Sequence, residues 1–111
     1  MNIQEIIELY GKIYCGKANE ACPIAINVLS ILYGKDIYPI SIAPSRDGKG
    51  VDIFLQNGDK MARLTCGKET LEATAEGRER KTTITPMEIV RMIEWLELAI
   101  GLLPLKPKRA A

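Results

Sequence analysis

The sequence predicts a two-layer α+β domain in which helices pack against a three-stranded antiparallel meander. Three observations favour this fold: an apolar segment at 22–34 between a proline and a glycine, two alternating segments around 57–58, and a helical pattern that begins at 85–86. The expected order is helix, helix, three strands, a short helix or loop, and a helix. We expect residues 1–103 to form this single domain and residues 104–111 to form a basic flexible tail.

Opposite patterns predict the first two helices. In residues 2–14 apolar side chains recur every three or four positions, which is typical of an amphipathic helix. In residues 22–34 only Asn27 and Ser30 interrupt the apolar surface, while Pro23 and Gly34 suit a helix start and a helix end. A helix that is apolar nearly all round must be covered on several sides, so we expect it to be central.

After this helix the sequence period changes to two. Tyr38, Ile40 and Ile42 alternate with other side chains, which predicts a strand, and Pro39 restricts that strand to a sheet edge or a strand start. A second alternating segment begins at 51 and leads into Asn57-Gly58. This dipeptide is typical of a type I′ hairpin turn, in which both central residues need a positive φ.

The hairpin predicts its own register. With residues 57–58 as the loop, we expect Phe54 opposite Met61 and Asp52 opposite Arg63. The other face of this hairpin is then wholly apolar, with Val51, Ile53, Leu55, Ala62 and Leu64.

The remainder of the chain divides into a polar segment and a helix. Residues 65–83 are charge-dense, and we expect a mobile loop with at best a short helix at 69–76 that Gly77 ends. Thr85 and Glu88 form a capping box with Pro86 at the first helical position. This last helix is expected to run to about Leu103, just before Pro104.

The last helix has two apolar stripes. One is spaced 4-3-4-3 and should face the sheet or the central helix; it comprises Ile89, Ile93, Leu96, Ile100 and Leu103. Trp95, Leu98 and Leu102 form a second, smaller group on another side. We interpret this group as a candidate subunit interface, and the alternative is that the first helix covers it within the monomer.

Composition excludes several kinds of chemistry. The chain has no histidine, which removes Ser-His-Asp and Cys-His catalysis and the commonest metal ligand. It shows no phosphate-binding or dinucleotide-binding fingerprint. A net charge of +1 gives no global field for nucleic acid or membranes, and the apolar segment at 22–34 is too short to span a bilayer. The acidic, amphipathic start is unlike a signal peptide, so we expect a cytoplasmic protein with reduced thiols.

The three cysteines are the main candidates for chemistry. Cys22 is the expected cap of the central helix, where the helix dipole would stabilise a thiolate. Cys15 lies in the preceding turn and Cys66 at the end of the third strand. If the three converge, they suit a thiol-redox pair, a persulfide carrier, or a metal or iron–sulfur site with a fourth ligand from elsewhere. The alternative is that they are small core side chains, and we expect no cofactor in that case.

Basic residues suggest a further hypothesis, nucleic-acid binding. The candidates lie in the polar segment and in the tail: Arg78, Arg80, Lys81, Lys106, Lys108 and Arg109. Glutamates interleave with the first group and no aromatic residue accompanies it, so a solvated loop and tail is the favoured interpretation.

These patterns favour a non-enzymatic binding or regulatory module. We expect a homodimer or a protein partner, contacted through Trp95, Leu98 and Leu102 and through a patch formed by Phe54 and Met61. No membrane partner is expected.

Overall fold

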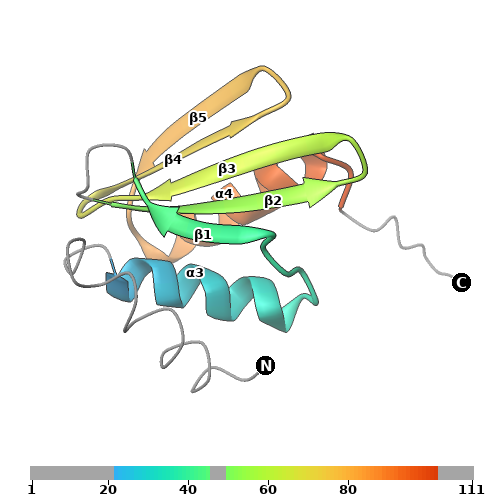
Figure 1. Ribbon diagram of the computed structural model, residues 1–111. Coiled ribbons are helices and arrows are strands. Elements are labelled where there is room, and N and C mark those ends of the chain that lie inside the picture. The colour runs from blue at the N-terminus through green and yellow to red at the C-terminus, as the bar shows by residue number, and fades with distance from the viewer. Residues whose placement is uncertain (1–21, 46–49, 103–111) are drawn as a thin grey trace, which may run out of the picture.

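The computed structural model describes residues 22–45 and 50–102, which form an α+β fold of two helices and one antiparallel sheet (Figure 1). The elements, in order, are α3 (Cys22–Gly34), β1 (Ser41–Pro44), β2 (Val51–Asn57), β3 (Lys60–Cys66), β4 (Thr70–Ala75), β5 (Arg78–Thr83) and α4 (Pro86–Ala99). The strand order β1-β2-β3-β4-β5 follows the chain, so the sheet is an open meander whose edges are β1 and β5. The helix predicted for residues 2–14 and the tail at 104–111 lie outside the described residues.

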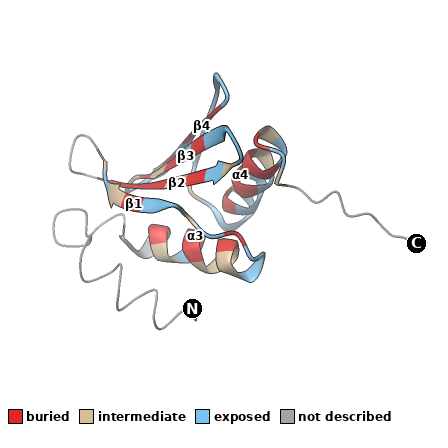
Figure 2. Ribbon diagram, turned by 45° about the vertical axis from the view of Figure 1, so that its right-hand side comes forward, coloured by how far each residue is buried: buried red, intermediate tan, exposed pale blue. Residues whose placement is uncertain are grey.

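A single core lies between the helices and one face of the sheet (Figure 2). Both helices lie on this face, and no described element covers the other (Figure 1). The sheet contributes Val51, Ile53, Leu55, Ala62, Leu64, Cys66, Leu71, Ala73 and Ala75, and the helices contribute Ala25, Val28, Leu29, Leu32, Ile89, Met92, Ile93, Leu96 and Ile100. In the part of the chain that the structure describes there is no helix of the length and apolarity that a membrane crossing requires.

α3 covers the predicted segment, 22–34, but it includes Cys22, the expected cap, and the residue with a positive φ beyond its end is Asp36 (φ +60°) rather than Gly34. Its buried side chains are Ala25, Val28, Leu29 and Leu32, while Asn27 is exposed. Just beyond its end, the Lys35 ammonium contacts the buried Glu97 carboxylate of α4 at 2.9 Å (Nζ to Oε1). This ion pair joins the end of one helix to the other.

The predicted strand at 38–42 begins later than its alternation suggested. The side chains of Ile37 and Ile42 are buried, whereas Tyr38 and Ile40 are more than half exposed. Tyr38 instead packs edge-on against Tyr33, with 5.0 Å between the ring centroids. The strand itself begins at Ser41, and the preceding Ile40 N–H donates to the Phe54 carbonyl of β2 at 2.9 Å. The edge position of this strand is as predicted.

The hairpin of β2 and β3 is present, but its register differs from the prediction by two residues. Asn57 pairs with Lys60, so Phe54 lies opposite Arg63, and Met61 lies opposite Gln56. Gly58 has φ +65° and Asp59 has no positive φ, which is the pattern of a type II′ turn with glycine first. Because the shift is an even number, the predicted apolar face is unchanged.

The prediction for residues 65–83 is wrong. Instead of a loop with a short helix, this segment forms a second hairpin, so the meander has five strands rather than three. Leu71, Ala73 and Ala75 alternate into the core. Glu76 (φ +51°) and Gly77 (φ +80°) are the two turn residues, both in the left-handed region that a type I′ turn needs.

The last helix begins as predicted and ends earlier. The Thr85 hydroxyl accepts a hydrogen bond from the Glu88 backbone N–H at 3.1 Å, which confirms the N-cap. At the other end, Gly101 has φ +74°, and the Leu102 N–H donates to the Glu97 carbonyl at 2.7 Å. These contacts form a Schellman motif, so the helix ends at Ala99 rather than near Leu103.

Candidate functional site

The uncovered face of the sheet carries a shallow hollow, which is the candidate binding site. Its volume is about 350 Å³. It is lined by Phe54, Met61, Ala62, Arg63, Thr74, Ala75, Glu76 and Gly77. The lining residues come from β2, β3, β4 and the β4–β5 turn, so the hollow depends on the second hairpin as well as the first.

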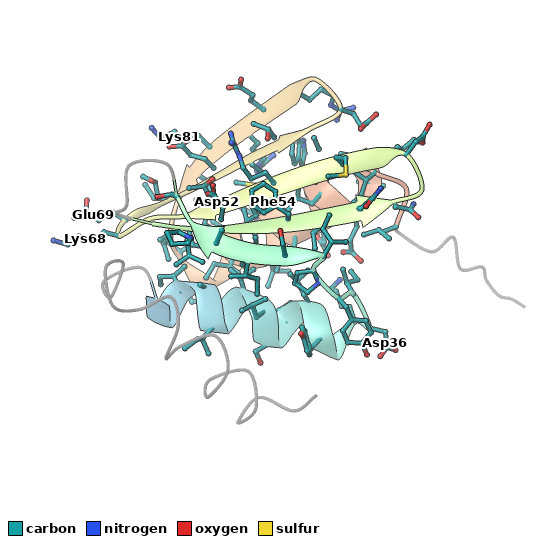
Figure 3. The ribbon with its side chains drawn as sticks, viewed as in Figure 1. Asp36, Asp52, Phe54, Lys68, Glu69 and Lys81 are labelled. Atoms are coloured by element: carbon teal, nitrogen blue, oxygen red, sulfur yellow. The ribbon has the colours of Figure 1, made fainter. Side chains whose placement is uncertain are left out.

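The sheet register places three residues of the site side by side. Phe54, Arg63 and Thr74 are direct cross-strand neighbours on three adjacent strands. Figure 3 shows Phe54 near the middle of the sheet, on the face opposite the helices. Because side chains on adjacent strands point to the same face when their residues pair, these three form a row across the open face.

The β4–β5 turn supplies an acidic group at the site. The Glu76 carboxylate accepts a hydrogen bond from the Met61 backbone N–H at 3.0 Å. This contact holds the turn against the first residues of β3. The hollow therefore combines an apolar part, formed by Phe54 and Met61, with a cation on Arg63 and an anion on Glu76.

This arrangement has the features of a recognition surface. An apolar surface with a few polar groups of both signs is typical of a recognition site. Thr74 supplies a hydroxyl group to the lining, which contains no cysteine, serine or lysine. Within residues 22–45 and 50–102 there is also no group of three or more histidine, cysteine, aspartate or glutamate side chains that could hold a metal ion.

Cys66 is placed where a reactive thiol is disfavoured. It lies at the end of β3, is completely buried, and belongs to the core on the helix-facing side. Burial raises the pKa of the Cys66 thiol to about 12, and the charge of Asp52 adds to this effect. The thiol is therefore protonated at neutral pH. Cys15 and the side chain of Cys22 lie outside the described residues, so convergence of the three sulfurs stays a prediction.

The basic residues of β5 have partners within the chain. Arg78 stacks over the Trp95 ring, with its guanidinium carbon 5.7 Å from the ring centroid. Lys81 faces the carboxylate of Glu72 on the neighbouring strand at 3.6 Å. The cations are thus dispersed between two faces of the sheet. The other nucleic-acid candidates, Lys106, Lys108 and Arg109, lie outside the described residues.

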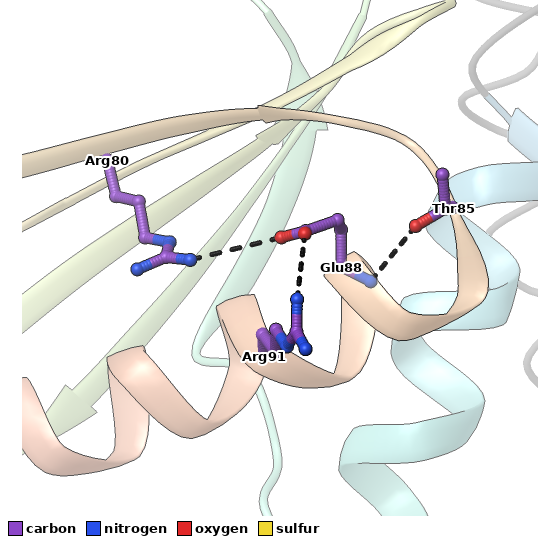
Figure 4. Close-up of polar contacts among 4 residues, drawn as sticks. All are labelled: Arg80, Thr85, Glu88 and Arg91. Carbon is purple, nitrogen blue, oxygen red and sulfur yellow. Dashed lines mark hydrogen bonds and ion pairs between the residues drawn. The ribbon is translucent and has the colours of Figure 1, made fainter.

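Arg80 is held by the last helix. Figure 4 shows the Glu88 carboxylate between Arg80 of β5 and Arg91 of α4, with N–O distances of 3.8 Å and 3.1 Å. The Glu88 carboxylate therefore contacts two guanidinium groups, and this cluster keeps a net positive charge.

The apolar interface candidates on α4 differ in exposure. Leu98 is 66% exposed, whereas Trp95 and Leu102 are half-buried against the core. Met87 and Val90, which were not candidates, are also exposed. On the sheet, Met61 is exposed and Phe54 is half-buried.

Three polar residues of the site, Arg63, Thr74 and Glu76, were not predicted as site residues. Two signals could have found the second hairpin that positions them. Apolar residues alternate at 71, 73 and 75, and a glycine follows at 77, where a tight turn can reverse the chain.

Comparisons of the chain with protein-family models, with curated proteins and with solved structures find no match.

Proposed function

We propose that this protein is a non-catalytic binding module that works as a homodimer and holds a short polypeptide segment on the open face of its sheet. The observation that carries the proposal is the hollow of about 350 Å³ around Phe54 and Met61, on the face that no described element covers. A volume of this size accommodates one or two side chains of a partner.

A peptide suits the chemistry of this site better than a charged small molecule. Met61 and Phe54 offer apolar contact, which favours an aliphatic or aromatic anchor. Arg63 and Glu76 have opposite signs, so the site has no strong preference for an anion or a cation. Backbone amides and mixed side chains of a peptide can satisfy both groups. Since the hollow is shallow, we expect affinities in the micromolar range (~1–100 μM).

Selection from a random 12-residue peptide library displayed on phage tests the proposal. We expect enriched peptides that share an apolar anchor. Truncating Met61 removes apolar contact worth about 1.5 kcal/mol or more, so Met61→Ser should weaken these peptides by roughly tenfold.

The matched control is Leu98→Ser, which changes an exposed apolar residue on the helical side of the molecule. It should change peptide affinity by less than about twofold. Binding measured by fluorescence polarisation, with circular dichroism to verify folding, gives the result. If no peptide is enriched, or if Met61→Ser binds the selected peptides as tightly as the native chain, the binding site is not this hollow.

A further inference from the structure

The two edges of the sheet differ in their capacity to accept another strand. An edge strand presents unpaired N–H and C=O groups to any extended segment that approaches it. β1 has four residues and ends in Pro44, which has no N–H to donate. β5 has six residues, contains no proline and follows a tight turn. The edge that can extend the sheet is therefore β5.

We propose that β5 pairs antiparallel with β5 of a second copy, which joins the two five-stranded sheets around a two-fold axis. This inference rests on the homodimer in the proposed function and names the surface that forms it. A two-fold interface is made by the same patch on both subunits, so the patch must be complementary to itself. The sequence and register of β5 meet this condition.

The backbone groups that face outward follow from the β4–β5 turn. Ala75 pairs with Arg78 across the two-residue turn, the position where the residues flanking a tight turn bond to each other. Because hydrogen-bonded and non-bonded pairs alternate in an antiparallel ladder, Arg78, Arg80 and Thr82 direct their backbone groups toward β4. Glu79, Lys81 and Thr83 then direct theirs toward solvent.

The side chains on the open face select one register. When the two-fold axis passes at Arg80, Glu79 lies opposite Lys81 of the second copy, and the same pair recurs on the other side of the axis. Opposite charges directly across from each other stabilise an antiparallel pair. Centring the pairing on Lys81 would place two lysines together, and centring it on Glu79 would place two glutamates together. Among these three registers, the one through Arg80 is the one in which the open-face charges attract.

Charged residues usually protect an edge strand from pairing with another chain. The contacts of the β5 arginines with α4 reduce this protection. Arg78 stacks on Trp95, and Arg80 contacts the Glu88 carboxylate, so both guanidinium groups are held against α4 on the core side of the sheet. Arg80 and its symmetry-related copy thus each lie near a Glu88 carboxylate, which each shares with Arg91. The charged side chains at the open side of the edge are Glu79 and Lys81, and the Lys81 ammonium also faces the Glu72 carboxylate of β4 at 3.6 Å.

The helices also fit this arrangement. α4 packs over β4 and β5, next to the proposed axis. With about 4.8 Å between strands, two such helices would lie roughly 10–14 Å apart across the axis. That separation is close to, or slightly wider than, the usual distance between packed helices, so the copies do not collide and long side chains can span the space.

Charge reversal tests the register with the full chain. Glu79→Lys places lysines opposite lysines, and Lys81→Glu places glutamates opposite glutamates. Sedimentation equilibrium should show a dimer for the native chain and dimers weakened by roughly tenfold or more for each variant. Mixing the two variants restores attraction at both positions, so a heterodimer with near-native affinity is expected. Lys60→Glu, the same charge change at an exposed position on β3, is the control and should leave the dimer unchanged.

Crosslinking gives a second readout that does not depend on charge. In a chain with Cys15→Ser and Cys22→Ser, Arg80→Cys places two thiols opposite each other at the axis, where Cα atoms of a non-bonded pair are about 4.5 Å apart. Mild oxidation should yield a disulfide-linked dimer. Glu79→Cys in the same background should not, because its copies are displaced along the strands to about 7–8 Å.

Three outcomes contradict the proposal, and they are distinguishable. A native chain that is monomeric at 100 μM, a concentration of the order used for such measurements, overturns both the homodimer and the β5 interface. A dimer that resists both charge reversals overturns only the β5 interface. A dimer that Leu98→Ser dissociates while the charge variants do not would place the contact on α4 instead. Peptide binding by the monomeric variants reports separately on the hollow.

Discussion

Cys66 shows how the position of one residue decides its chemistry. The alternation of β3 predicts its side, because it shares the apolar face with Ala62 and Leu64, and the structure places all three in the core. The depth of burial could not be predicted, since it depends on residues distant in the sequence, among them its β4 partner Leu71. That depth, more than any nearby charge, raises the thiol pKa to about 12.

The raised pKa predicts a pH dependence of stability. The unfolded chain releases the Cys66 proton near pH 8.5–9, whereas the folded chain retains it up to about pH 12. The stabilisation is complete below pH 8.5 and is lost as pH rises between these values. The free energy of unfolding should fall by about 1.4 kcal/mol per pH unit in this window through this group alone.

Urea unfolding at pH 8 and pH 10 under reducing conditions, with Cys66→Ala as the reference, measures this effect. The variant is less stable at pH 8, but its stability should fall less between the two pH values than that of the native chain. Equal slopes for the two proteins would show that Cys66 ionises as easily in the folded state as in the unfolded one.

At the scale of elements, sequence patterns predict the positions of the two described helices more reliably than they predict strand pairing. The segment that forms α3 and the Thr85 cap are as predicted because each depends on a few adjacent residues. The β2–β3 register differs because Asn57-Gly58 and Gly58-Asp59 are both acceptable turns. In the structure the Asn57 side chain donates to the Ile100 carbonyl at 2.6 Å, a contact 43 positions away that the local sequence cannot reveal.

In the second hairpin, tertiary contacts override the local preference of the sequence. Residues 69–76 are rich in Glu, Ala and Leu, which favour helices in isolation. Pairing with β3 and burial of Leu71 outweigh this preference. Half of the candidate site depends on this hairpin, which is why Phe54 and Met61 could be placed on a common face from sequence and Thr74 and Glu76 could not.

Two glycine substitutions should have opposite effects because the backbone differs. Gly101→Ala places a side chain at φ +74°, and its Cβ would be 3.4 Å from the Asn57 amide nitrogen. We expect a loss of about 1–2 kcal/mol in the free energy of unfolding. Gly34→Ala, where φ is not positive and no atom lies within 4 Å of the added Cβ, should gain up to about 1 kcal/mol.

Urea titrations of both variants, monitored by circular dichroism, check this prediction. A destabilised Gly34→Ala, or a Gly101→Ala as stable as the native chain, would be inconsistent with the helix ends described above. The pair is informative because the chemical change is the same at both sites.

At the scale of the whole molecule, both described helices pack on one face of the sheet, and no described element covers the other face. The core lies entirely on the helical side, and the side chains that point to the opposite face are mostly polar. Composition alone predicts a core of ordinary size but not which face it covers. Which face the core covers becomes clear only when the helices and all five strands are placed together.

Adjacent residues on β3 should therefore differ sharply in their effect on stability. Leu64 is completely buried in the core, so Leu64→Ala should lower the free energy of unfolding by about 2–5 kcal/mol. Arg63 is the neighbouring residue on the open face, and Arg63→Ala should lower the free energy of unfolding by about 0.5 kcal/mol or less. Thermal and urea unfolding of the two variants measure the contrast, and similar losses at both positions would mean that the open face is also packed.

The proline that ends β1 has a consequence for how far assembly can proceed. A sheet whose two edges both accept strands can add copies without limit, which is how fibrils grow. With Pro44 at one edge, pairing is restricted to the other, and a contact of an edge with its own copy uses up both participants. The proposed dimer would then be a closed particle whose two remaining sheet edges are the short β1 strands, each ending in a proline.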